Sequence, residues 1–387
     1  MEHLVVRSSD IDIERVSSLI PDSKNTLIFI YGPSNFRSDN KRSDKLFPNK
    51  EKLYNQICNV FQKSTIIGVS SGTSICNSNL VINDSVIGFV HFKKASFKSL
   101  HEIVSLESDE KTLVSEMVDK LWSDDLKGIY ILYDGIHLNG DNVVSGIKNS
   151  LKKNIPVVGG ASSIENDEFD TWLFYNKKFS QNSIILVGFY GDVEISFGIG
   201  SGWKATKEQY PITNKDDIVY EIAGQPALDK YKEIIGPDEA DLLPQSAARH
   251  PLIVVNNNCS EDERIVRGIY NVDEDKKQLL LTGNIEQASM VKIGSATIPD
   301  LISGANEAAM LTARHAKGEG IVLAGSCVAR KWKMENKTRQ ELRYMNSFFE
   351  EGVNIIGFYT HGEIAPTDKG EIMLHNQTMT MMFINET

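Results

Sequence analysis

Cysteine is scarce in this sequence. The 387 residues include four cysteines, none of them spaced as C-x-x-C, at Cys58, Cys76, Cys259 and Cys327. This scatter predicts neither a disulfide framework nor a cysteine-based zinc site. No secretory apolar segment opens the chain, and the first apolar run, Leu27 to Tyr31, is far too short to cross a bilayer. We therefore expect a reduced, cytoplasmic protein with no membrane segment.

Positive charge is also in short supply. Lysine and arginine number 41 against 52 acidic residues, which gives a net charge of -11 and a pI of about 5.3. A protein that neutralises nucleic-acid phosphates needs a basic surface, so we expect no nucleic-acid partner. With 41% hydrophobic and 24% charged residues, the composition is that of an ordinary globular protein, and the length predicts two or three domains.

A recurring order of elements is present instead. The first copy has a buried strand at Leu27–Tyr31, an amphipathic helix, and the strand "TIIGVSSGTSI", which enters a glycine-serine turn. A hairpin is predicted over Asn79–Phe92, with Asn83 and Asp84 as its turn. The second copy has the strand "GIYILYDG", a helix over Asp141–Lys152, the strand "IPVVGGASS" and further strand pairs. The matching positions predict an internal duplication.

A third copy follows near the C-terminus. The strand "GIVLAGSC" is followed by a helix that carries Thr338-x-x-Glu341, a capping-box pattern. The strand "NIIGFYTHGEI" and the return strand "LHNQTMTMMFI" complete the unit. We predict an α/β protein of two lobes, with mixed β-sheets flanked by helices and built from repeated β-α-β-hairpin units.

The domain limits follow from changes in pattern. Residues 1–25 are polar with a weak helical pattern and are expected to form an N-terminal extension. Residues 26–215 form the duplicated first domain, 216–245 a helical linker and 246–387 a second domain. Within the linker, Gly224 breaks one predicted helix and Pro226 begins another.

The turns that follow the strands are the candidate binding site. In open α/β sheets, ligands bind beyond the carboxyl ends of the strands, where glycine admits close approach and serine offers hydrogen bonds. A single such turn is commonly only a turn, but several at equivalent positions suggest one shared site. The candidate ligand-binding residues are Ser70, Ser71, Gly72, Gly159, Gly160, Ser162, Cys327, Arg330, Tyr359, His361, Glu363, His375 and Asn376.

These residues allow several chemistries. Arg330 and Glu363 suit a clamp for the two charged ends of an amino acid, or a structural ion pair between neighbouring turns. Cys327 suits a nucleophile, with Arg330 favouring its thiolate and His361 or His375 as base, or a buried cysteine. The histidines have no metal-binding spacing, although a single histidine, such as His361, suffices as an axial haem ligand.

Several motifs in this order resemble the FIST family of intracellular sensory domains. The first half resembles its N-terminal domain through "IIGVSSGTSI", "VVGGASS", "GSGWK" and "GQPALDKYKEIIG". The second half resembles its C-terminal domain through "LLLTGNI", "GSCVARK", "GFYTHGEIAP" and "LHNQTMT". The resemblance covers the chain from about Asn25 onward.

The resemblance implies a stand-alone sensor rather than an enzyme. It would bind a small ligand such as an amino acid and signal through a separate partner, for example a sensor histidine kinase. Some stand-alone members are haem-containing nitric-oxide sensors, so haem is a possible cofactor. The family more often has an aromatic residue where this chain has His361, which makes His361 the candidate haem ligand. His375, within the more typical "LHN", is expected to be structural. A cysteine-dependent hydrolase is the remaining alternative.

Overall fold

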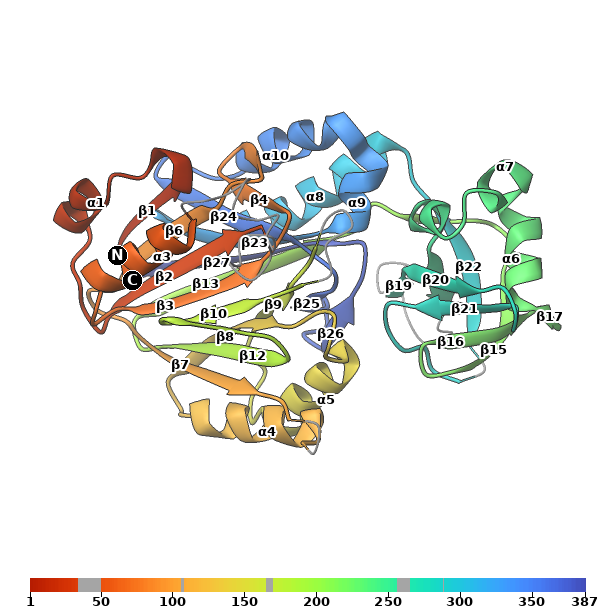
Figure 1. Cartoon of the computed structure of the whole chain (residues 1–387), viewed down its shortest axis with the longest axis horizontal. Helices are drawn as coiled ribbons and strands as arrows, with labels where there is room; N and C mark the ends of the chain where they lie inside the picture. The colour runs from red at the N-terminus through yellow and green to blue at the C-terminus, as the bar shows by residue number, and fades with distance from the viewer. Residues whose placement is uncertain (34–49, 106–107, 165–169, 256–264, 288) are drawn as a thin grey trace.

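The computed structural model describes residues 1–33, 50–105, 108–164, 170–255, 265–287 and 289–387. Its larger lobe holds three six-stranded sheets, and its smaller lobe holds a nine-stranded sheet (Figure 1). The two-lobed α/β architecture with mixed sheets and flanking helices is therefore confirmed. Among the described residues, no helix has both the length and the apolar character needed to cross a membrane.

The three sheets of the larger lobe share one design. The first has the order β1-β6-β2-β3-β10-β11, with bounds Glu2–Arg7, Val86–His91, Thr26–Gly32, Thr65–Ser70, Leu173–Tyr175 and Lys178–Ser180. The second has the order β26-β25-β9-β8-β12-β7, with bounds Ile372–His375, Glu363–Pro366, Val157–Ala161, Leu126–Tyr133, Ser183–Tyr190 and Ser96–Ile103. The third has the order β13-β27-β23-β24-β4-β5, with bounds Val193–Gly200, Met379–Glu386, Gly320–Cys327, Val353–Thr360, Thr73–Cys76 and Asn79–Ile82.

Each sheet is built on one parallel pair of strands joined by a helical crossover. The pairs are β2 with β3, β8 with β9, and β23 with β24. Helices cover the outer faces: α3 the first sheet, α4 and α5 the second, and α8 and α10 the third. Their bounds are Lys50–Val60, Glu110–Leu121, Gly140–Ser150, Ile298–Ala313 and Thr338–Asn346. The three repeated units expected from the sequence are confirmed.

The hairpin that follows each parallel pair in the chain pairs with the sheet of a neighbouring unit. The hairpin β4-β5 follows β3 in the chain but pairs with β24 of the third sheet. Likewise, β10-β11 follows β9 but pairs with β3, and β25-β26 follows β24 but pairs with β9. This cyclic exchange means that no unit completes its sheet alone. The predicted hairpin over Asn79–Phe92 is wrong for the same reason, because β5 pairs with β4 while β6 pairs with β1 and β2.

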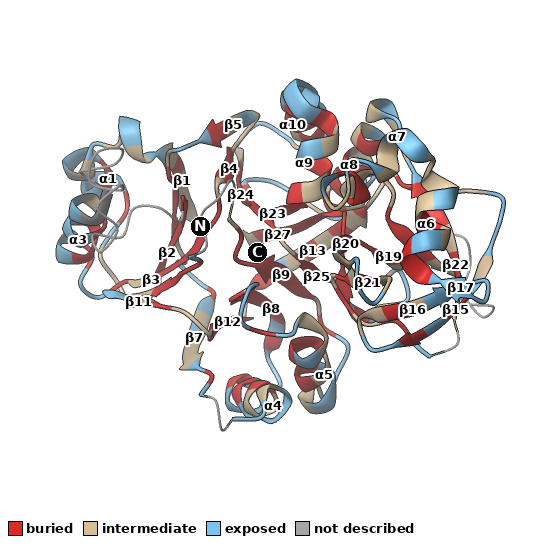
Figure 2. Cartoon of the chain, turned by 45° about the vertical axis from the view of Figure 1, so that its right-hand side comes forward, coloured by how far each residue is buried: buried red, intermediate tan, exposed pale blue. Residues whose placement is uncertain are grey.

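The core of the larger lobe lies between its three sheets. Apolar side chains from all three meet there, and the Tyr31 and Tyr130 hydroxyls are hydrogen-bonded at 2.7 Å. The Tyr31 ring also lies 5.0 Å from that of Phe358. Figure 2 shows these strands as buried, whereas the outward faces of α4, α5 and α10 are exposed. The fully apolar strands of the sequence are therefore covered on both faces, as their lack of polar alternation predicts.

The smaller lobe is inserted between β13 and α8 of the larger one. Its sheet has the order β19-β18-β22-β15-β16-β21-β20, with β14 pairing with β22 and β17 with β16. In that order the strands span Ile265–Arg267, Leu252–Val255, Met290–Ser295, Tyr210–Lys215, Ile218–Ile222, Gln278–Leu281 and Ile269–Asp273, followed by Lys204–Ala205 and Gln225–Pro226. The helices α6 (Ala227–Ile235) and α7 (Pro237–Ala240) and the 3-10 turn η3 (Gln245–Arg249) complete it.

Three local predictions need correction. Residues 218–222 form strand β16 rather than a helix, because Val219 and Ile222 face the core of the smaller lobe, whereas the helix after Pro226 is present as α6. The N-terminal extension carries α1 (Ile13–Leu19), but β1 is also an edge strand paired with β6. Thr338 does not cap a helix through Glu341. The predicted domain limits stay a prediction.

Candidate functional site

The turns after the parallel strands meet inside the larger lobe. The Ser71 hydroxyl donates to the Tyr359 carbonyl oxygen at 2.8 Å and accepts from the Tyr359 amide at 3.1 Å. The Ser163 hydroxyl also donates to the Tyr359 carbonyl oxygen, and the Ser163 amide donates to the Ser70 carbonyl oxygen at 2.9 Å. All four residues are at most 1% exposed. The shared meeting point expected from the sequence therefore exists, but its polar groups are satisfied by one another.

A cavity lies beside this meeting point, between the two lobes. Its volume is about 640 Å³. The larger lobe contributes the loop from β8 to α5, the ends of β23 and β24, the helix α9 (Val328–Met334) and the turn between β26 and β27. The smaller lobe contributes η3, β20 and the segment after β21. The cavity is therefore at the carboxyl ends of parallel strands, the usual place for a ligand in α/β folds.

The deep polar lining of this interlobe cavity comes from the turn between β26 and β27. Gln377 is 1% exposed, and neither of its amide atoms has a hydrogen-bond partner among the described residues. Asn376 is 2% exposed, and its Nδ2 also has no hydrogen-bond partner among the described residues. Gln377 has φ of 58°, a left-handed conformation that is uncommon for a residue with a side chain. An unsatisfied buried amide costs about 1 to 3 kcal/mol, so a ligand that gives these groups a hydrogen-bond partner would relieve that cost.

A polar bridge joins the two lobes next to the cavity. Arg267 of β19 is 3% exposed and donates to the Leu374 carbonyl oxygen at 3.0 Å across the lobe boundary. Its Nη2 lies 3.7 Å from an Asp141 carboxylate oxygen of α5, and burial lowers the pKa of its guanidinium. The main-chain N–H of Asn284 donates to the other Asp141 carboxylate oxygen at 2.7 Å. The bridge fixes the lobes relative to each other in this arrangement.

Comparison with known proteins identifies both halves of the chain. A model of the FIST N domain matches residues 43–225, and a model of the FIST C domain matches residues 227–366. The chain belongs to the FIST family. FIST domains are signal-transduction sensory domains that are thought to bind small ligands. No curated protein matches the chain. A crystal structure of cyanuric acid hydrolase from A. caulinodans is similar at 8% identity and a TM-score of 0.39, covering 100% of this chain and 99% of that one.

In this FIST protein, three of the predicted site residues line the interlobe cavity. They are Cys327, His361 and Asn376. His361 is half-buried, and burial lowers the pKa of its imidazole to about 4, against a smaller opposing effect of its hydrogen bond to the Ile164 main chain. The imidazole is therefore neutral at pH 7. Ser70, Ser71, Gly72, Gly159, Gly160, Ser162 and Tyr359 do not line this cavity.

Arg330 and Glu363 do not form a pair around the cavity. Arg330 is fully buried, forms an ion pair with Glu341, and donates to the carbonyl oxygens of Ser201 and Leu301. Glu341 is also fully buried, and the pKa of its carboxyl is raised by desolvation. Glu341 of the Thr338-x-x-Glu341 pattern is therefore the ion-pair partner of a buried arginine. A ligand clamp made by Arg330 and Glu363 is not present in this arrangement.

Glu363 and Cys327 lie in a common buried environment. Glu363 Oε2 accepts from the Thr378 hydroxyl at 2.8 Å and from the Thr378 amide at 3.1 Å. Burial nevertheless raises the pKa of Glu363 to about 8. Burial, followed by the Glu363 carboxylate, raises the pKa of the Cys327 thiol well above its usual value, although Arg330 has a small opposing effect. The Cys327 thiol is therefore protonated at neutral pH, which is unfavourable for a nucleophile.

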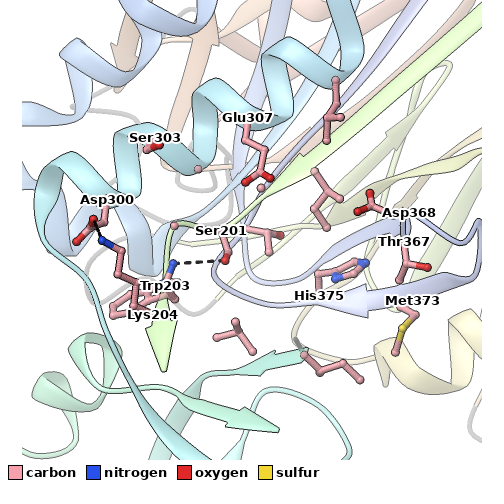
Figure 3. Close-up of a pocket in the computed structure, with 18 residues that line it drawn as sticks. Ser201, Trp203, Lys204, Asp300, Ser303, Glu307, Thr367, Asp368, Met373 and His375 are labelled. Atoms are coloured by element: carbon pink, nitrogen blue, oxygen red, sulfur yellow. Dashed lines mark hydrogen bonds and ion pairs between the residues drawn. The ribbon is translucent and has the colours of Figure 1, made fainter. Parts of the chain in front are cut away.

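The FIST protein has a second, more polar cavity of about 540 Å³ next to α8 (Figure 3). Lys204 forms an ion pair with Asp300 on its rim. His375 lines it, and burial lowers the pKa of this histidine to about 4, while its Nε2 lies 3.1 Å from the Ala365 carbonyl oxygen. The structural role expected for His375 stays a prediction. Among the described residues, no three histidine, cysteine or acidic side chains are grouped to hold a metal ion.

The sequence did not indicate three residues that define the interlobe cavity. Gln377 follows the predicted Asn376 directly, but no periodicity or motif distinguishes it. Tyr270 and Trp332 line the cavity and are 56% and 55% exposed. A solvent-exposed tryptophan on an otherwise basic helical segment, "RKWKM", was the one available signal.

Proposed function

We propose that this protein is a sensor whose ligand binds in the interlobe cavity and whose state is read by a separate partner protein. The observation that carries this proposal is the buried Gln377 amide and the buried Asn376 Nδ2, which have no hydrogen-bond partner among the described residues and belong to side chains that line a cavity between two lobes. The sensory character of FIST domains supports the same function. The scarcity of cysteine supports a reduced, cytoplasmic setting.

The proposed mechanism is a shift between two arrangements of the lobes. A ligand can change this equilibrium only if it binds one arrangement more tightly than the other. The cavity wall is divided between the lobes, so its shape depends on their separation. The bridge of Arg267, Asp141 and Asn284 holds the present arrangement and is the contact that opening would break. A partner such as a sensor histidine kinase would then recognise one of the two arrangements.

A free amino acid is one ligand that fits this proposal in part. Asp141 and Asp217 line the cavity and suit an ammonium group. Arg330 is not available for the carboxylate, because it is buried against Glu341. The carboxylate would depend on amide donors from Asn376 and Gln377.

A thermal-shift screen with the amino acids and other small metabolites tests the proposal. A ligand at 100 times its Kd stabilises the native state by about 2.7 kcal/mol, so a true ligand raises Tm. Ala329→Phe places a ring in the cavity and should abolish the shift, while Met310→Phe, on the exposed face of α8, should retain it. A ligand that shifts both variants equally would show that it binds elsewhere.

Haem is the second candidate ligand, and the placement of His361 favours it. A neutral imidazole faces the cavity, and the exposed side chains of Ile136, Tyr270 and Trp332 supply an apolar wall for a porphyrin. Haem would supply an iron centre able to bind nitric oxide. The acidic residues Asp141 and Asp217 do not suit the haem propionates, which must then face solvent.

The haem candidate has a direct spectroscopic test. Protein expressed with haem supplied should show a Soret band, and His361→Ala should lose it. The exposed His315→Ala is the matched control and should keep the band. Protein that takes up no haem, or a band that persists in His361→Ala, would contradict His361 as the ligand.

A further inference from the structure

The chemical class of the ligand can be argued from three features of the interlobe cavity. The first is its deep polar end. Gln377 and Asn376 line the cavity, and the buried donor and acceptor of the Gln377 amide and the buried Asn376 Nδ2 have no hydrogen-bond partner among the described residues. Asn376 Oδ1 is held by Arg267 Nη1 at 3.5 Å, so the orientation of that amide is set from the smaller lobe. A carboxamide has a hydrogen-bond donor and an acceptor side by side, so it is matched best by a ligand group that has an acceptor and a donor side by side.

The second feature is charge. The charged side chains that line the cavity are Asp141 and Asp217, and no lysine or arginine is found among the described lining residues. Arg267, which contacts the lining residue Asn376, is already directed to the carbonyl oxygens of Leu374 and Asn284 and to the Asp141 carboxylate. Arg267 is therefore already paired with Asp141, and a ligand carboxylate or phosphate would meet Asp217 and find no unengaged cation among the described lining residues. This arrangement selects against anionic ligands.

The third feature is an aromatic rim. Tyr270 comes from β20 of the smaller lobe and Trp332 from α9 of the larger lobe, and each is more than half exposed. Ile136, from the loop between β8 and α5, adds an apolar side chain that is 44% exposed. Large apolar side chains that line a cavity and remain exposed commonly contact a ligand. Aromatic side chains from the two lobes suit a flat ring.

We propose that the ligand is an uncharged flat ring that carries an amide edge, meaning an N–H donor next to a C=O acceptor. The ring contacts Tyr270 and Trp332, and the edge forms paired hydrogen bonds with the Gln377 carboxamide beside Asn376. This inference rests on the proposed function, since it requires the interlobe cavity to be the ligand site. It distinguishes the ligand from a free amino acid, whose carboxylate the cavity does not favour.

Matched small probes test this class. The pairs nicotinamide and nicotinate, benzamide and benzoate, and uracil and orotate each compare an uncharged amide ring with an anionic relative. Saturation-transfer NMR on the full chain, at millimolar probe, should detect the uncharged members and miss the anions. Trp332→Ala should weaken the uncharged probes about threefold to tenfold, as expected for the loss of one aromatic contact. Trp332 is exposed, so this variant should fold.

Gln377→Leu tests the paired hydrogen bonds between the amide edge of the ligand and the Gln377 carboxamide. Gln225→Leu, at an exposed position, is its matched control. Gln377→Leu should weaken binding of the uncharged amide probes, whereas Gln225→Leu should leave that binding unchanged. Anions that bind as well as amides in the wild type, or amide binding that is unchanged in Gln377→Leu, would overturn the inference but leave the interlobe site intact. Probe binding that persists in Ala329→Phe, or no binding by any probe, would overturn the proposed site as well.

Discussion

The stability of Glu363→Gln relative to the wild type should increase as the pH rises. Glu363 is fully buried, and its Oε1 has no hydrogen-bond partner among the described residues. Burial raises the pKa of its carboxyl to about 8 from an ordinary value of 4.5. Between these two pH values the native protein keeps the proton, while the unfolded chain releases it. The contribution of Glu363 to the free energy of unfolding is therefore fully present below pH 4.5 and is lost as the pH rises through 8.

The size of the effect follows from the same shift. Each pH unit between 4.5 and 8 costs the wild type about 1.4 kcal/mol relative to a side chain that cannot titrate, on the order of 5 kcal/mol in total. Glutamine has nearly the same shape, and its carbonyl oxygen can accept both hydrogen bonds from Thr378. The stability of the variant relative to the wild type should therefore increase steadily from pH 5 to pH 8.

Urea unfolding followed by tryptophan fluorescence at pH 5, 6, 7 and 8 measures this difference. Other titrating groups are common to both proteins and cancel when the two free energies of unfolding are subtracted. Glu194→Gln, an exposed position on β13, is the matched control and should differ from the wild type by a nearly constant amount. A difference between wild type and Glu363→Gln that does not change with pH would refute the reasoning.

Three further outcomes are expected. Arg330→Met should destabilise by about 3 to 5 kcal/mol in urea unfolding because it leaves the buried Glu341 unpaired, and adding Glu341→Leu should restore most of the loss. Iodoacetamide should modify Cys327 at least about a hundredfold more slowly in native protein than in urea, as peptide mass mapping would measure. Because burial lowers the pKa of His375 to about 4, the wild type should lose up to about 3 kcal/mol of stability through this group as the pH falls from 6.5 to 4. His375→Gln should not show this part of the loss in urea unfolding over the same pH range.

The repeated units were predictable because their signals are local. Fully apolar strands such as Leu27–Tyr31 and glycine at the strand ends identify the elements and their order. The exchange of hairpins was not predictable from the same signals. Asn83 and Asp84 have the composition of a hairpin turn, but which strand β5 pairs with is decided by contacts with β4 and the third sheet. Strand pairing between distant segments leaves no local pattern.

The candidate site was predictable in part for a similar reason. Cys327 is the last residue of β23 and His361 directly follows β24, so their position at the cavity follows from the rule for α/β sheets. The ion pair between Arg330 and Glu341 could not be predicted from the sequence, because Glu341 also fits a capping pattern and only tertiary packing shows that it is buried. Gln377 reaches the cavity through a left-handed turn, which its residue type does not predict.

Native mass spectrometry on protein purified from its own host tests the central claim most directly. The account predicts that wild-type protein retains a bound small molecule, that Met310→Phe retains it too, and that Ala329→Phe, which fills the interlobe cavity, does not. A retained molecule of equal occupancy in Ala329→Phe would contradict the claim that the ligand binds between the lobes.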